Sequence, residues 1–98
     1  MTQIRLLQSA LEDLDRGRQF YERQGEGLGA SFLDSLFSEI DSLTLYRGIH
    51  SKVFGYHRLL ARRFPYAIYY RTERETDVLV YRVLDLRQSP SFVRRSLS

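Results

Sequence analysis

Three successive segments in the second half of the chain are rich in Val, Ile, Tyr and Phe, and they restrict the possible folds more than any other feature of the sequence. They cover residues 53–64, 66–72 and 77–85 and show a near two-residue periodicity, which is typical of β-strands. Pro65, which cannot donate a hydrogen bond within a sheet, separates the first two segments, and the polar residues 72–77 predict a hairpin loop between the last two. We therefore expect three consecutive antiparallel strands. The side chains expected on a common face are, in the middle strand, Tyr66, Ile68 and Tyr70 and, in the last strand, Leu79, Tyr81 and Val83.

Two segments with helical periodicity precede these strands. The first ends near Arg23, and Ser9 with Glu12 forms a capping-box pattern at its start. Gly17 lies on its apolar face, which indicates the close approach of a second helix. That second helix is expected from about Leu28 to Tyr46. Because only a short break with glycines joins the two helices, they must form an antiparallel hairpin.

The order of these segments defines the expected fold class. Residues 3–7 predict a short first strand, so the chain reads strand, two helices and three strands. This order is typical of an α+β domain in which an antiparallel helical hairpin packs on a mainly antiparallel sheet of three to four strands. From Ser89 onward, apolar residues at helical spacing predict a short C-terminal helix or an extended arm. A chain of 98 residues is long enough for one domain, residues 1–98.

Composition excludes several classes of protein and of site. Hydrophobic residues make up 43% of the chain, which is too many for a disordered tail. There are no cysteines, so disulfides, thiolate nucleophiles and cysteine zinc sites are excluded. His50 and His57 have no carboxylate at a recognisable metal-ligand spacing, and we expect no metal and no cofactor. Since no apolar run is long enough for a transmembrane helix or a signal peptide, we expect a cytoplasmic protein without membrane contact.

The net charge of +3 conceals an uneven distribution along the chain. Residues 1–51 carry five basic and eight acidic side chains, whereas residues 52–98 carry ten basic and four acidic ones. A basic half indicates an anionic partner, which is either a nucleic acid or an acidic protein segment. The alternative is that arginines at alternate strand positions only solvate one face of the sheet. The tyrosines of this half either stack on bases or, as is more common, form the core of the sheet.

Several short sequence segments, in the order in which they follow one another along the chain, resemble the RelE/ParE superfamily of bacterial type II toxins. They are residues 20–24 (FYERQ), residues 27–29 (GLG) with Phe32, residues 62–71 (RRFPYAIYYR) and residues 83–90 (VLDLRQSP), which together extend over nearly the whole chain. The resemblance implies a toxin that is encoded beside a small antitoxin, whose amphipathic segment wraps around the toxin and neutralises it. It also implies a helical hairpin on an antiparallel sheet.

Two activities occur in that superfamily, and the residues of this chain favour one of them. The RelE-like branch cleaves mRNA in the ribosome with basic side chains and usually a C-terminal tyrosine, whereas the ParE-like branch inhibits DNA gyrase without cleaving RNA. This chain has Ala67 where the nuclease branch carries an arginine, and Phe92 and Val93 where it places the tyrosine. Only Arg87 falls on a matching basic position. We therefore expect a ParE-like, non-catalytic inhibitor of gyrase.

Two alternatives remain open. The first is a ribosome-dependent mRNA endonuclease, for which the catalytic candidates are Arg87 and Arg71. Such chemistry requires cations and an acid–base group around one phosphate. The second is a degenerate toxin that retains only antitoxin binding.

The candidate contact residues are arginines of the basic half. Arg82 lies in an apolar strand, where its charge needs a partner such as Asp85 or an antitoxin carboxylate. Arg87, just beyond the last strand, is the strongest single candidate. The residues expected to bind the target or the partner are Arg62, Arg63, Arg82, Arg87, Arg94 and Arg95. The alternative for the pairs at 62–63 and 94–95 is that they only solvate a strand end and the tail.

Overall fold

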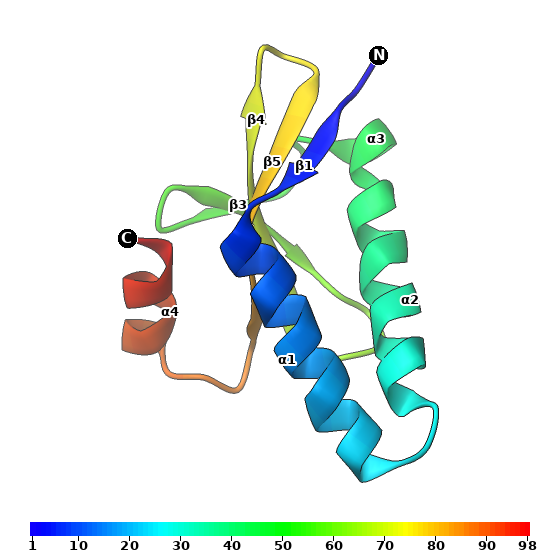
Figure 1. Ribbon diagram of the computed structural model, residues 1–98. Coiled ribbons are helices and arrows are strands. Elements are labelled where there is room, and N and C mark those ends of the chain that lie inside the picture. Colours follow the sequence, from blue (N-terminus) through cyan, green and yellow to red (C-terminus); the bar gives the residue numbers. More distant parts are fainter.

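Helices cover both faces of a central sheet in the computed structural model, which describes every residue from Met1 to Ser98 (Figure 1). The helices α1 (Gln8–Gln24) and α2 (Leu28–Asp41) form an antiparallel hairpin on one face, and the short helix α3 (Leu43–Tyr46) follows α2. The helix α4 (Pro90–Leu97) packs on the opposite face. The predicted hairpin and the predicted C-terminal helix are both confirmed. None of the helices combines the length and the apolar composition that crossing a bilayer requires.

A close contact between α1 and α2 holds the hairpin together. Gly17 of α1 faces the buried ring of Phe32, and a Cβ atom at Gly17 would lie 2.4 Å from Cζ of that ring. The turn between the helices is fixed by Glu22, whose carboxylate accepts hydrogen bonds from the N–H groups of Gly27 and Gly29 at 3.2 and 2.9 Å. These two bonds also lower the pKa of Glu22. The close helix approach that Gly17 predicted is therefore confirmed.

Two expectations about the helix ends are wrong. There is no capping box, because α1 begins at Gln8 directly after the first strand and the Ser9 hydroxyl donates to the carbonyl of Tyr81 at 3.0 Å. The second helix does not continue to Tyr46 without a break. Its regular turns end at Asp41, and the Ser42 hydroxyl donates back to the carbonyl of Glu39 at 2.6 Å. A side chain that binds its own backbone in this way competes with the helical pattern.

The sheet has five strands in the order β1-β5-β4-β3-β2. The strand β1 (Ile4–Leu6) pairs in parallel with β5 (Asp77–Asp85), and β4 (Tyr66–Glu73) pairs with β5 in an antiparallel ladder. The strands β3 (Tyr56–Leu60) and β2 (Lys52–Val53) complete the antiparallel part. The α+β class is thus confirmed. The additional strand arises because the segment expected as one strand over 53–64 is broken by a tight turn at Phe54 and Gly55 and ends at Leu60.

A β-bulge changes which side chains of β5 share a face. Tyr69 pairs with Arg82 but Tyr70 pairs with Val80, so Tyr81 has no partner of its own in the ladder. An extra residue of this kind reverses the alternation of side chains beyond it. The expectation that Leu79, Tyr81 and Val83 share a face is therefore wrong. The residues of β5 that pack under the hairpin are Val78, Val80 and Val83.

The core is divided into two parts by the sheet. The larger part lies between the hairpin and the sheet and contains Tyr66, Ile68 and Tyr70, which confirms their predicted common face. The smaller part lies under α4 and contains Tyr56, Ala67, Tyr69 and Leu84 with Val93 and Leu97. The hydroxyl of Tyr56 donates to the carbonyl of Leu97 at 3.0 Å, which ties α4 to the sheet. Most of the tyrosines of this half therefore serve packing, and their rings are not free to stack on bases.

Candidate partner-binding surface

Arg82 lies inside the fold and connects three elements. From β5, its Nε and Nη2 atoms donate to both carboxylate oxygens of Asp13 on α1, at 2.7 and 2.9 Å. Its Nη1 atom donates to the carbonyl of Ser96 on α4 at 3.0 Å. Hydrogen bonding to Asp13 raises the pKa of Arg82. The predicted need for a carboxylate partner is met by Asp13 and not by Asp85, so the guanidinium is engaged internally.

Arg87 lies at the rim of the sheet and binds Asp85 in a fork. Its Nε and Nη2 atoms donate to the two carboxylate oxygens of Asp85 at 2.9 and 2.6 Å, which lowers the pKa of Asp85. The same guanidinium lies 5.6 Å from the ring centroid of Phe20 on α1. Burial raises the pKa of the neighbouring Tyr66 to about 12, and the charge of Asp85 adds to this shift. Tyr66 therefore keeps its proton at neutral pH.

A groove of about 360 Å³ runs between α1 and the end of β5, beside the ion pairs of Arg82 with Asp13 and of Arg87 with Asp85. Arg16 and Arg23 of α1 line one wall, and Gln88 and Phe92 line the other. Arg16 also donates to Asp13 at 2.7 Å, although its side chain is mostly exposed. The groove presents more cations than carboxylates to solvent.

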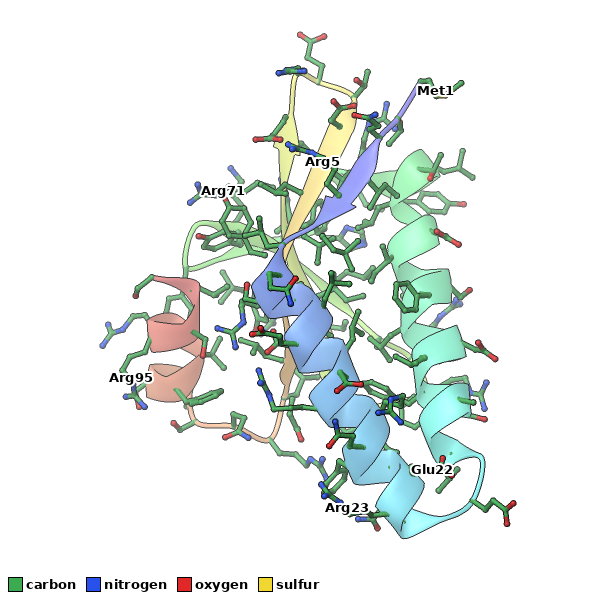
Figure 2. The ribbon with its side chains drawn as sticks, viewed as in Figure 1. Met1, Arg5, Glu22, Arg23, Arg71 and Arg95 are labelled. Atoms are coloured by element: carbon green, nitrogen blue, oxygen red, sulfur yellow. The ribbon has the colours of Figure 1, made fainter.

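Arg71 projects from the other end of β4, on the face that carries α4. Its guanidinium lies 4.3 Å from the ring centroid of Tyr56 and 5.4 Å from that of Tyr81. Stacking of this kind orients an arginine without neutralising its charge. Figure 2 shows that Arg71, Arg95 and Arg23 point in different directions from separate parts of the molecule.

The two arginine pairs predicted as contacts lie on opposite sides of the sheet. Arg62 and Arg63 follow β3 beside α2, where the backbone N–H of Arg62 donates to the buried carboxylate of Glu39 at 2.8 Å. Both side chains are exposed. Arg94 and Arg95 are exposed on the last turns of α4. The structure thus brings Arg82 and Arg87 to the end of β5 but does not bring the other four arginines to them.

Sequence reasoning missed an exposed apolar surface beside β3. The hollow between α2, α3 and β3 has a volume of about 300 Å³ and is lined by Tyr46, Ile49 and Leu60 together with Glu39 and Arg62. Ile49 is 71% exposed and Leu60 is 48% exposed. The sequence does contain a signal for this surface, because the apolar Ile49 follows Gly48, the glycine that ends the helical segment. Without the fold, nothing showed that Ile49 remains uncovered.

Comparison with known proteins confirms the resemblance. The profile of the family described as "ParE toxin of type II toxin-antitoxin system, parDE" matches residues 4–90. The solved structure described as "Chromosomal ParDE TA system from P. aeruginosa" is similar in fold, with a TM-score of 0.71 and 18% identity over 89% of this chain and 98% of the other. No curated protein matches the chain. Because the family match covers most of the described fold, the chain belongs to the ParE toxin family of type II toxin–antitoxin systems.

Proposed function

We propose that this toxin acts in the cytoplasm by binding DNA gyrase, without a catalytic step of its own, and that a cognate antitoxin neutralises it. The observation that carries this proposal is the separation of Arg71 from Arg87. Arg71 lies opposite Leu79 in the ladder, and Arg87 follows Asp85. At about 3.3 Å per strand residue, positions 79 and 85 are about 20 Å apart. The two guanidinium groups are also held on opposite faces of the sheet, Arg71 over Tyr56 and Arg87 beside Phe20 of α1, so they do not converge on one phosphate.

Proton transfer is a second difficulty for a ribonuclease. The titratable side chains beside Arg87 are Asp85, Tyr21 and Tyr66. Asp85 is already engaged by Arg87, and burial raises the pKa of both tyrosines above their usual value. A tyrosine with a raised pKa does not accept a proton from a ribose hydroxyl at neutral pH. These residues favour a binding protein over a nuclease.

The antitoxin surface in this proposal is the hollow beside β3, continued along α2. An acidic, amphipathic segment would place apolar side chains on Ile49 and Leu60 and carboxylates near Arg62 and Arg63. Two N–H groups near this edge are already engaged, because Arg58 donates to the carbonyl of Ser51 and Arg62 donates to Glu39. Side-chain packing, more than strand addition, would therefore hold the segment.

The target surface in this proposal lies at the rim that follows β5 and on the face of the sheet that carries α4. Arg87 at the rim and Arg94 and Arg95 on α4 would contact gyrase, since the antitoxin hollow does not include them. Arg82 would act only indirectly, by holding α4 through the carbonyl of Ser96.

The test is expression of the chain alone and in the presence of the protein encoded by the adjacent reading frame. Expression alone should stop growth, and the purified toxin should inhibit DNA supercoiling by gyrase while a cell-free translation reaction continues. Cleavage of mRNA in the ribosome that is lost on Arg87→Ala would instead establish the endonuclease alternative. A chain that is harmless but is held tightly by its partner would establish a degenerate toxin.

A further inference from the structure

The turn between β2 and β3 contains a phenylalanine in a strained backbone conformation. Phe54 and Gly55 connect Val53 to Tyr56 and have φ angles of 53° and 85°. Positive φ at both central residues is the requirement of a type I′ turn, for which Asn-Gly is the preferred pair. Bulky residues adopt positive φ only rarely. Strain of this kind is often found at sites where the side chain has a function.

The core does not compensate for this strain. Phe54 is 46% exposed. It belongs to neither part of the core, whereas its neighbours Val53 and Tyr56 both pack under α4. Asparagine or glycine at this position would favour the turn and leave the core unchanged. The core therefore gives no reason for a phenyl ring here.

Beside this ring lies an apolar groove of about 210 Å³ between the turn and the start of α4. Its apolar walls include Val53, Leu86, Pro90 and Val93, and Leu86 is 40% exposed. One cation, Arg58, lines the groove, and no carboxylate does. An apolar hollow with an aromatic side chain at its edge has the composition of a binding hot spot.

The chemistry of the groove selects the kind of partner. Aliphatic walls accept an apolar side chain and offer few groups that would recognise a base edge, and the single guanidinium of Arg58 suits one carboxylate. A nucleic acid would require a row of cations along its backbone. A protein segment with an apolar residue next to an acidic one fits both features. The groove also lies on the face of the sheet opposite the helical hairpin.

We propose that Phe54 anchors the toxin to DNA gyrase and that the adjoining groove takes an apolar side chain from an acidic segment of that enzyme. This inference rests on the proposed function. The groove remains exposed when the hollow beside β3 is filled, so target and antitoxin would contact different surfaces of the toxin.

The decisive variant is Phe54→Asn, which removes the ring and favours the turn. The concentration of purified toxin that half-inhibits gyrase supercoiling should rise at least tenfold, while the thermal midpoint stays the same or increases. Binding of the variant to the adjacent-frame antitoxin should be unchanged. Arg58→Gln should weaken gyrase inhibition several-fold, most clearly at low salt.

A matched control is Glu75→Gly in the turn between β4 and β5. Glu75 also has positive φ, at 68°, so glycine relieves strain there without touching the groove. This variant should inhibit gyrase like the wild type.

The remaining outcomes overturn the inference in distinguishable ways. Full gyrase inhibition by Phe54→Asn would overturn the docking site but leave the proposed function intact. Absence of gyrase inhibition by the wild type would overturn both. A fall in stability on Phe54→Asn would show a structural role, and a fall in antitoxin binding at unchanged stability would assign the groove to the antitoxin. Binding of a single-stranded oligonucleotide that disappears with the ring would show a nucleic-acid partner instead.

Discussion

Arg82 and Asp13 form a two-point ion pair that joins β5 to α1 across the interior. Asp13 is 5% exposed and also accepts from the backbone N–H of Val83 at 3.0 Å. Both carboxylate oxygens are thus fully engaged. Because Arg82 also donates to the carbonyl of Ser96, the same pair sets the position of α4. A charge that was proposed as a contact residue from sequence is consequently part of the scaffold.

The first prediction concerns the removal of that carboxylate. Asp13→Asn leaves the guanidinium of Arg82 partly buried without its counterion, and we expect the free energy of unfolding to fall by about 3 kcal/mol or more. Arg16→Gln is the control, since Arg16 contacts the same carboxylate but its side chain is 65% exposed. Its effect should stay below about 1 kcal/mol. Urea unfolding measures both values, and equal effects of the two substitutions would contradict this account.

The second prediction concerns Gly17. Replacing a helical glycine by alanine normally stabilises by about 1 kcal/mol. Here the new methyl group would overlap the ring of Phe32, and overpacking of this kind costs about 1–3 kcal/mol. Gly17→Ala should therefore lower the thermal midpoint. In a Phe32→Leu background the same change should be neutral or stabilising, and a double-mutant cycle that shows no coupling between the two sites would sink this explanation.

The elements that could be predicted from sequence are those that depend on residues close to one another along the chain. The hairpin follows from the short linker around Gly27, and the common face of Tyr66, Ile68 and Tyr70 follows from simple alternation. The bulge at Tyr81 could not be predicted, because it depends on how two strands align and not on either strand alone. The expected face of β5 was wrong for that reason.

The candidate site was harder to predict because its contacts are distant in sequence. Arg82 and Asp13 are separated by 69 positions, so local spacing favoured the nearer Asp85. The break at Phe54 was also missed, since the pair Phe-Gly lacks the Asn or Asp that usually indicates a type I′ turn. Family resemblance identified the class of protein, but it did not show which arginines are exposed.

The third prediction is a pH dependence of stability that His50 causes. Its Nδ1 atom lies 2.5 Å from the hydroxyl of Tyr70, which in turn accepts a hydrogen bond from the N–H of Gly48 at 2.9 Å. Burial lowers the pKa of His50, with a smaller contribution from the charge of His57 and an opposing one from Glu39. A depressed folded-state pKa means that the unfolded chain binds the proton more strongly. The stabilising contribution is complete above the unfolded pKa of about 6.5 and is lost as the pH falls through the folded value.

The free energy of unfolding should therefore decrease between about pH 7 and pH 5, and the decrease should be smaller in His50→Gln. Chemical unfolding at a series of pH values measures this slope. The glutamine side chain retains an acceptor for the hydroxyl of Tyr70 but does not titrate in this range. An identical slope in wild type and variant would assign the pH dependence to other groups.

The fourth prediction concerns the balance of forces in the antitoxin complex. If apolar contacts at Ile49 and Leu60 supply most of the affinity and Arg62 and Arg63 supply the rest, added salt should weaken the complex only in part, because screening acts on exposed charges. Leu60→Ser should then weaken binding far more than Arg63→Gln, and only the arginine variant should reduce the salt dependence. Titration of the toxin with the adjacent-frame antitoxin at about 0.05 M and 0.5 M salt measures both effects. Complete dissociation by salt alone would show that charge holds the partner and that the hollow beside β3 is not its main contact.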